Sequence, residues 1–305
     1  MTPDSRVGVR SFSKRIEGDC PVCGKTELRW RFAKKGRQFW RCEGCGVEKQ
    51  HPLPTRRELE AYYDAEFDHG MYETFTAAED MKRMTARQRL NEILVHLPPF
   101  GRWLDVGAAN GVFVREARAE EIEAEGIELS AVAVERARDA ELPVRCAALE
   151  DLDSSEKYDC ITAFDVLEHV LDPTGFVESV VAHLRPGGHV AMTLPNEASL
   201  FCRLMGRRWW FYIPEEHLHY FNPRNVTRLF ENAGLEILTV GRSFKPLTFN
   251  YGLTQFIEYN PLIYRLMKLA GVFLPARARE WIVPCYIGEM KVIARLPDPD
   301  AICEA

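Results

Sequence analysis

Four cysteines near the start of the chain have a spacing that is suited to metal binding. They are Cys20, Cys23, Cys42 and Cys45. They form two CxxC pairs that are 18 residues apart, and thiolates at this spacing typically hold a structural zinc ion in a closed tetrahedral site. Between the pairs, an alternating segment at 28–32 and a returning segment at 38–40 flank a Lys-Lys-Gly-Arg turn. We therefore expect a zinc-ribbon hairpin, in which metal binding stabilises a module too small for a large core.

A second segment with the residue types of a ligand site lies at 102–113, where a short apolar run leads into small residues. Asp105, Gly107 and Gly111 follow the pattern D-x-G-x-x-x-G. Small residues in a strand-to-helix turn let a ligand approach the backbone, and the amides at the start of the following helix point toward it. The spacing differs from G-x-G-x-x-G and disfavours a nicotinamide or flavin ligand.

Three strand-like runs follow this turn, at 122–128, 143–147 and 158–164, and each ends in residues that suit a binding site. In open α/β sheets, ligands lie outside the carboxyl ends of the strands. Glu128 ends the first of these runs, and Asp165 and His169 follow the last one closely. We expect these side chains to gather at one edge of a sheet.

The first of these motifs, Leu-Asp-Val-Gly-Ala-Ala-Asn-Gly at 104–111, resembles the first motif of class I S-adenosylmethionine-dependent methyltransferases. Ala109 stands where that family usually has its middle glycine. The D-V-L-E-H string at 165–169 and the Leu-Arg-Pro-Gly-Gly turn at 184–188 are similar to later motifs of its small-molecule members, such as quinone-type enzymes. The resemblance covers about residues 100–195 and implies S-adenosylmethionine as the cofactor.

The resemblance also implies which residues bind the cofactor. They are Asp105, Gly107, Ala109, Gly111, Glu128, Leu129, Ala148, Leu149, Phe164 and Asp165. Glu128 is at the position where the family accepts the ribose hydroxyls. The segment at 148–152 matches the adenine contact, with Ala148 where the family often has an acid.

A base is the main catalytic group that this cofactor requires. Its sulfonium methyl is already activated, so the protein must align a nucleophile and remove a proton. His169 is the first candidate because its unperturbed pKa lies near neutral pH. Its alternative roles are to cap a helix or to pack beside the cofactor.

The segment at 201–221 is rich in arginines, aromatics and histidines and predicts a substrate wall. Arginines beside aromatic faces suit phosphate or carboxylate groups on an apolar or ring body, whereas the alternative is a solvated basic turn followed by a core helix. The E-H-L-H-Y-F string at 216–221 resembles a string of the deoxysugar C-methyltransferases, which also begin with a cysteine-rich zinc region. This resemblance implies that Glu216 and His217 take part in proton transfer.

These elements predict an α/β fold: a doubly wound, mostly parallel, seven-stranded, Rossmann-like methyltransferase sheet preceded by a small zinc ribbon. We expect the ribbon at 1–54, a helical bridge at 55–98, the cofactor-binding core at 99–241, and an amphipathic cap with the last strand at 242–305. A helix that begins near Asn260 is expected to cover the active site. Membrane-surface contact through 260–275 and a dimer contact are the alternatives.

The composition predicts a globular protein, with 46% hydrophobic and 28% charged residues. The longest stretch without Asp, Glu, Lys or Arg, 246–257, has 12 residues and is too short to span a bilayer. The first ten residues are polar and resemble no secretory signal, so we expect a cytoplasmic location. The oligomeric state is left open.

The charge is unevenly divided along the chain. Residues 1–57 carry 14 Lys and Arg against 6 Asp and Glu, a net +8, and the remainder carries −14. The ribbon is therefore a structural element or lid, an RNA-binding surface, or a protein-docking module.

Three functions follow from these observations. The leading one is methyl transfer to a small molecule (a sugar, quinone or lipid-linked intermediate) with a histidine base. An RNA methyltransferase is the first alternative, although the Pro-Pro-aromatic string typical of base amino-group methylation is absent after Asp165. The second alternative is a cofactor-binding protein without catalysis.

Overall fold

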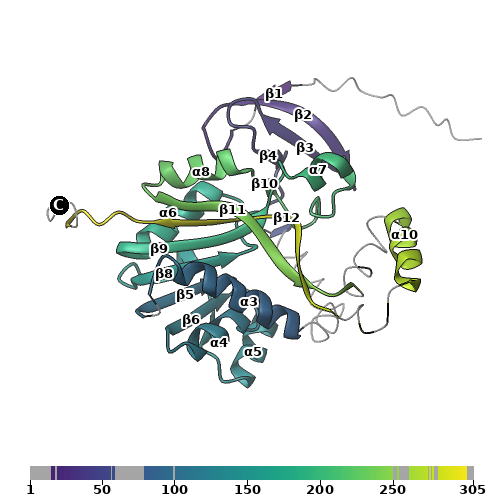
Figure 1. Ribbon diagram of the computed structural model, residues 1–305. Helices are drawn as coiled ribbons and strands as arrows, with labels where there is room; N and C mark the ends of the chain where they lie inside the picture. The colour runs from purple at the N-terminus through teal and green to yellow at the C-terminus, as the bar shows by residue number, and fades with distance from the viewer. Residues whose placement is uncertain are drawn as a thin grey trace, which may run out of the picture.

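The computed structural model describes residues 15–17, 19–55, 57–58, 79–98, 100–249, 253, 261–273, 275, 277 and 281–300. Two sheets organise the chain, a large central one and a smaller one formed mostly by the N-terminal module (Figure 1). Residues 59–78, nearly half of the predicted bridge at 55–98, lie outside the described residues.

The central sheet has seven strands in the order β11-β12-β9-β8-β5-β6-β7. Its strands are β5 (Arg102–Val106), β6 (Glu123–Glu128), β7 (Val144–Cys146), β8 (Tyr158–Phe164), β9 (Leu184–Pro195), β11 (Glu236–Leu247) and β12 (Val283–Arg295). The five strands β5 to β9 pair in parallel, and β12 runs antiparallel to both β9 and β11. The predicted doubly wound, mostly parallel, seven-stranded fold is confirmed.

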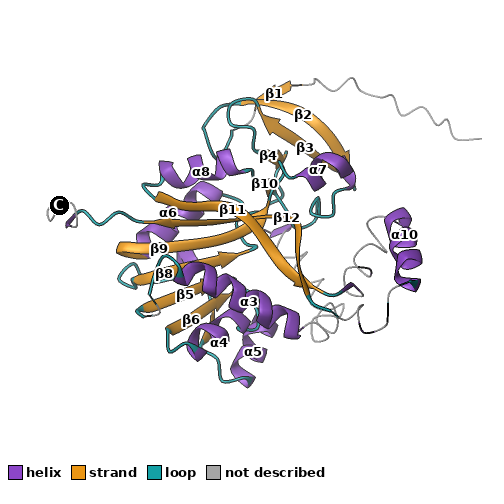
Figure 2. Ribbon diagram, in the orientation of Figure 1, coloured by secondary structure: helices purple, strands orange, loops and turns teal. Residues whose placement is uncertain are grey.

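Helices cover both faces of this sheet (Figure 2). On one face lie α3 (Glu79–Leu94), α4 (Val112–Ala119) and α5 (Ala131–Asp139), and on the other lie α6 (Pro173–His183) and α8 (Pro223–Asn232). Each face has its own hydrophobic core: Leu90, Phe113 and Val134 belong to the first, and Phe176 and Phe230 to the second. Apolar faces on the helices thus fix the sheet whose carboxyl edge holds the candidate site.

The ribbon sheet contains β1 (Arg15–Glu17), β2 (Glu27–Lys34), β3 (Arg37–Cys42), β4 (Glu48–Gln50) and β10 (His219–Tyr220). The predicted hairpin is β2 and β3, joined at Lys35 and Gly36. Its fifth strand, β10, comes from the substrate-side segment and pairs antiparallel with β4. The N-terminal module and the core therefore share one sheet, which the sequence did not predict.

Several elements lie beyond the carboxyl edge of the sheet. They are η1 (Leu149–Asp151), α7 (Leu200–Met205), η2 (Gly206–Arg208) and α10 (Pro261–Val272). Strands β11 and β12 extend past the sheet as a two-stranded arm, so the last strand is much longer than the predicted core of 290–294. Among the described helices, none is long and apolar enough to cross a membrane.

Candidate functional site

The loop that follows β5 is shaped by two glycines with left-handed backbone conformations. Gly107 has φ 72° and Gly111 has φ 78°. A Cβ at Gly107 would lie 2.7 Å from Val166, and one at Gly111 would lie 2.8 Å from Leu142. Both positions therefore require glycine for conformation and for space, and the backbone of the loop stays open to a ligand.

Glu128 lies beside this loop at the end of β6. Its carboxylate accepts hydrogen bonds from the backbone N–H groups of Ala109 and Ser130, each at 2.9 Å. Ala109 has φ 46°, a conformation in which alanine is strained and the usual glycine is not. One carboxylate is thus fixed against the loop, in a position to accept two neighbouring hydroxyls.

The other residues that are predicted to bind the cofactor at this edge differ in the exposure of their side chains. Leu129 is 69% exposed, directly after β6. Leu149 is buried in the core, and Ala148 precedes η1, in which Glu150 and Asp151 are exposed, so this segment offers backbone groups and two acidic side chains. Asp105 is buried and accepts a hydrogen bond from Thr162 at 2.6 Å, and burial raises the pKa of Asp105 to about 7. Asp105 therefore supports the loop from within the sheet.

Asp165 stands at the end of β8, in a left-handed conformation with φ 60°. It lies 2.8 Å from Arg89 of α3, and it accepts a hydrogen bond of 3.0 Å from Thr193 of β9. Lys245 of β11 approaches it to 3.5 Å. Burial alone would raise the pKa of Asp165, but Lys245 and Arg89 outweigh it and the pKa is lowered. The Phe164 ring lies under the Arg89 guanidinium at 4.5 Å.

Strand β12 supplies a second acid to this charged group, at the point where it begins to pair with β9. Glu289 of β12 is 1% exposed in its side chain and pairs with Lys245 at 2.5 Å. Sequence reasoning missed Arg89, Lys245 and Glu289. The one sequence signal was the position of Glu289 directly before the apolar strand residues at 290–294. A buried acid at such a position requires a nearby cation, so it predicts an ion pair.

Two of the three candidate histidines come together at the same edge. The rings of His169 and His217 are perpendicular, with centroids 4.7 Å apart. Nδ1 of His217 lies 2.8 Å from the carbonyl oxygen of Phe211 and must donate to it, so Nε2 is the unprotonated acceptor of the neutral ring. Burial lowers the pKa of His169 to about 4 and that of His217 well below its usual value.

Two acidic residues flank this histidine pair. Ligand atoms of Glu168, His169 and His217 all lie within 4.8 Å of one another. Glu168 is buried, its Oε2 has no hydrogen-bond partner among the described residues, and burial raises its pKa. His169 forms a hydrogen bond with the backbone of Glu216, so Glu216 orients the pair through its main chain.

The remaining alternatives for the histidines are resolved by position. Asp172 caps α6 by accepting from Thr174 and Gly175, so His169 is not the helix cap. His219 is fully buried in β10, with Nε2 3.4 Å from the carbonyl oxygen of Leu171. It belongs to the ribbon sheet and not to the pair.

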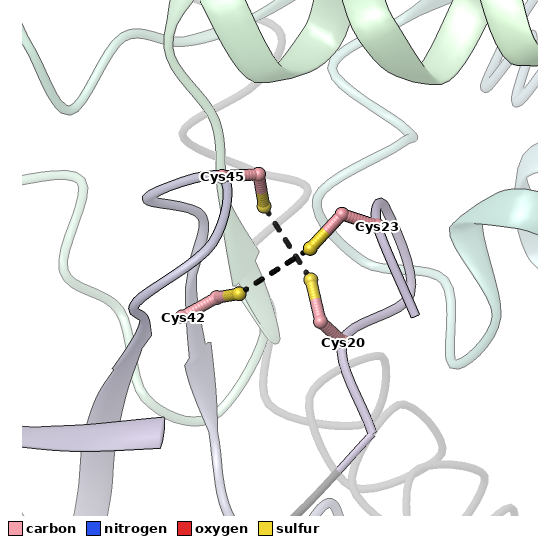
Figure 3. Close-up of side chains that lie close together, drawn as sticks. All are labelled: Cys20, Cys23, Cys42 and Cys45. Atoms are coloured by element: carbon pink, nitrogen blue, oxygen red, sulfur yellow. Dashed lines mark hydrogen bonds between the residues drawn. The ribbon is translucent and has the colours of Figure 1, made fainter. Parts of the chain in front are cut away.

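The four N-terminal cysteines converge on one point (Figure 3). The Sγ atoms of Cys20 and Cys45 are 3.4 Å apart and those of Cys23 and Cys42 are 3.5 Å apart, and all four lie within 4.8 Å of one another. A tetrahedral ion with Zn–S bonds of about 2.3 Å requires sulfurs about 3.8 Å apart. The donor set and its dimensions therefore fit a structural zinc ion.

The ribbon is fastened to the segment that carries His217. Tyr212 donates to the buried carboxylate of Glu48 at 2.6 Å, and the Gln50 amide donates to the carbonyl oxygens of Pro214 and His217. The 209–217 segment is thus held between the ribbon and the core. No core helix forms there, and its aromatic side chains Trp209 and Tyr212 are buried.

Comparisons with known proteins agree with this arrangement. A family model described as a methyltransferase domain matches residues 77–240. The ubiquinone biosynthesis O-methyltransferase of Alkalilimnicola ehrlichii is 28% identical over 178 residues, 53% of this chain and 72% of that protein. The corresponding enzyme of Vibrio parahaemolyticus is 25% identical over 176 residues, 53% of this chain and 75% of that protein.

Solved structures show the same fold. The 1,6-didemethyltoxoflavin-N1-methyltransferase of Burkholderia thailandensis, solved with its substrate and S-adenosylhomocysteine, has a TM-score of 0.52 at 14% identity, covering 88% of this chain and 99% of that one. A possible histamine N-methyltransferase of Thermotoga maritima has a TM-score of 0.51 at 16% identity, covering 79% and 100%. Since the family model covers more than half of the residues, this chain belongs to the methyltransferase domain family and is an S-adenosylmethionine-dependent methyltransferase.

Proposed function

We propose that this enzyme transfers the methyl group of S-adenosylmethionine to a small-molecule acceptor, and that the pair of His169 and His217 takes up the acceptor's proton. The observation that carries the proposal is the position of two neutral imidazoles at the sheet edge that also holds the Glu128 loop and Asp165. A neutral imidazole can accept a proton without first losing one.

The cofactor would lie along the carboxyl ends of β5, β6 and β8. Glu128 would accept the ribose hydroxyls, the backbone after Ala148 would face the adenine, and the 107–111 loop would approach the methionine part. S-adenosylmethionine supplies the activated methyl group. The residues of this chain orient the cofactor and remove the acceptor's proton.

A hydroxyl or an acidic carbon is the acceptor that this arrangement favours, because methylation there releases a proton that a neutral base must hold. The ubiquinone O-methyltransferase relatives favour a phenolic hydroxyl of a quinone-type molecule. The Glu216-His217 string supports a sugar carbon as the other acceptor, and lipid-linked forms of either remain within the proposal. Glu168, buried beside the pair and with its pKa raised by burial, would pass the proton onward.

The ribbon would serve as a structural element, with the four cysteines holding one zinc ion. RNA recognition is disfavoured because Phe39 and Trp40, two of the ribbon aromatics that could stack on bases, are buried. Trp30 is 42% exposed. The ribbon arginines Arg31 and Arg41 pair with Glu48.

The α10 helix would contact an anionic lipid surface, where a lipid-linked or quinone acceptor is dissolved. Leu266, Leu269, Val272 and Phe273 are between 59% and 82% exposed. Arg265 and Lys268 lie among them, and 261–273 contains no acidic residue, although the whole chain carries a net charge of −6. Apolar and basic side chains on one short helix are typical of interfacial binding.

The first test is transfer of labelled methyl from S-adenosylmethionine into a host extract, separated into RNA, protein, lipid and small-molecule fractions. We expect label in the lipid or small-molecule fraction. Label in RNA would contradict the proposal and make the ribbon the recognition module. Absence of label in every fraction, together with tight cofactor binding, would support a protein without catalysis.

Two variants test the roles of the residues. Glu128→Gln should weaken S-adenosylhomocysteine binding at least about tenfold in calorimetry, which is about 1.4 kcal/mol. Glu123→Gln, an exposed position at the start of the same strand, is its control. His217→Asn should lower methyl transfer about 100-fold and leave S-adenosylhomocysteine affinity within about twofold. His96→Asn is the matched control, because His96 bonds Thr239 outside the site.

A further inference from the structure

A cavity of about 420 Å³ lies between the ribbon and α7, apart from the cofactor loop. Its lining includes Arg31 of β2, Arg41 of β3, and Arg203 and Arg207 of the α7–η2 segment. A volume of this size accommodates a small organic ligand. Four guanidinium groups from two modules thus line one concavity in a chain whose net charge is −6.

Only part of this positive charge is balanced. Arg31 lies 2.6 Å from the buried carboxylate of Glu48, and Arg41 lies 3.5 Å from Glu48 and 3.4 Å from Glu197. Arg203 and Arg207 form no ion pair with any carboxylate in the part of the chain that the structure describes. Two of the four cations therefore have no counter-charge among the described residues.

Two of the cavity's cations, Arg31 and Arg41, are held in place by ion pairs, whereas Arg203 and Arg207 are exposed. Arg41 is fixed by Glu197, which also accepts 2.7 Å from Asn222 of the core. Arg203 lies on α7, and Gly206, with φ 53° and ψ −132°, turns the chain so that Arg207 lines the same space. The fixed guanidinium groups of Arg31 and Arg41 recognise an anion with little loss of conformational entropy, and Arg203 and Arg207 add charge that is free to pair with it.

Phe32 and the buried Tyr212 also line the cavity, as does Glu197, whose carboxylate is paired with Arg41. Guanidinium groups bind phosphate oxygens in a bidentate manner, and adjacent rings suit an organic body attached to the phosphate. We propose that this cavity binds a phosphoryl group, a phosphate or diphosphate ester on a small organic molecule. Such a ligand would contact the ribbon and the core together.

This site is distinct from the histidine pair, although the two share a wall. Tyr212 lines the cavity, and the adjacent residue Phe211 accepts the hydrogen bond from His217. The phosphoryl group belongs either to the methyl acceptor itself, as a substituent, or to a separate ligand. The inference rests on the cavity and holds whether or not the proposed reaction is correct.

The test measures inorganic pyrophosphate binding to the full chain by calorimetry. We expect saturable binding by the wild-type protein, a loss of affinity of at least about tenfold in Arg203→Gln/Arg207→Gln, and no change beyond about twofold in Arg208→Gln. Arg208 is the matched control because it is exposed on the same segment and does not line the cavity. Equal affinity in all three proteins would overturn the proposal, as would absence of binding at millimolar concentration.

Two further measurements keep the result interpretable. Unchanged S-adenosylhomocysteine affinity shows that the double variant is folded, and the single variant Arg207→Glu should weaken pyrophosphate binding in the same direction. Tighter binding of citrate than of pyrophosphate would overturn the phosphoryl assignment.

The methyl-transfer assay identifies the source. If phosphatase treatment of the extract removes the acceptor, the phosphoryl group belongs to the acceptor. If transfer persists, the group belongs to a separate ligand. Failure of methyl transfer altogether would count against the proposed function only, because pyrophosphate binding is measured independently.

Discussion

Burial determines the protonation of the histidine pair. The pKa of His169 is lowered to about 4 and that of His217 falls well below its usual value, in both cases chiefly because the rings are removed from water. At pH 6 the two rings are neutral in the folded protein, although unfolded histidines are largely protonated there. Each ring therefore weakens the folded state as the pH falls below about 6.5, since the unfolded chain then binds more protons.

This leads to a prediction that nuclear magnetic resonance can check. In the ¹⁵N-labelled protein, the imidazole signals of His169 and His217 should not shift between about pH 5.5 and 8. Free histidine in the same buffer provides the reference titration, and His169→Asn and His217→Asn assign the signals. A normal titration midpoint near pH 6.5 for either ring would show that it is solvated and contradict the structure.

The arm of β11 and β12 depends on a buried ion pair for its position over the site. Lys245→Met leaves Glu289 without its cation and should lower the free energy of unfolding by about 3 kcal/mol. The double variant Lys245→Met/Glu289→Gln should recover most of the loss, because no uncompensated acid remains. Urea unfolding measures both values.

The control for this prediction lies on the same strand as Glu289, β12. Lys291 pairs with Glu92 at 3.0 Å, with both side chains 22% exposed. Lys291→Met should therefore cost less than about 1 kcal/mol. If Lys245→Met and Lys291→Met lowered the free energy of unfolding equally, the Lys245–Glu289 pair would contribute no more to stability than a partly exposed pair.

We predict that the ribbon needs a bound zinc ion in order to fold. Freshly purified protein should contain one zinc ion per chain, and Cys42→Ser should lose the zinc and lower the melting temperature, because metal binding supplies folding free energy to this module. Cys146→Ser, at an exposed cysteine outside the cluster, should retain both zinc and stability. Metal analysis that finds no zinc in the wild-type protein would be decisive against the site.

Elements with local signals were predictable. The two CxxC pairs and the Lys-Lys-Gly-Arg turn predicted the β2–β3 hairpin, and the strand run at 158–164 matches β8. Asn222 and Asn225 form a capping box at the start of α8, with Pro223 at the first helical position, a pattern that the local sequence alone carries. In each case the information lies within a few residues of chain, where backbone preferences act directly.

Contacts between distant elements were not predictable. Arg89 and Lys245 meet at Asp165 only because α3 and β11 are brought to the same sheet edge, and neither residue is marked by a local pattern. The pairing of β10 with β4 involves two and three residues, too few to carry a strand pattern. The loops that form the candidate site were therefore predictable from the sequence, whereas the charged residues that contact Asp165 were identified only in the structure.

At the scale of the whole molecule, the exposed face of α10 predicts a measurable affinity for lipid. The full chain should sediment with vesicles of phosphatidylglycerol and much less with vesicles of phosphatidylcholine, and Leu266→Glu/Leu269→Glu should abolish the difference. Arg115→Gln on α4, which removes a half-buried cation far along the chain, is the control for charge alone. If the wild type is a dimer that binds no vesicles, and Leu266→Glu/Leu269→Glu dissociates it, α10 is instead a contact between two copies of the chain.

The sheet shared by the ribbon and the core has a consequence for the order of events during synthesis. Strand β4 ends at Gln50, and its partner β10 begins at His219, about 170 residues later. At translation rates of 5–20 residues per second, β4 remains an open edge for roughly 10–30 s after it leaves the ribosome. Zinc supply and chaperone occupancy during that interval therefore affect how much of the newly made chain reaches the folded state.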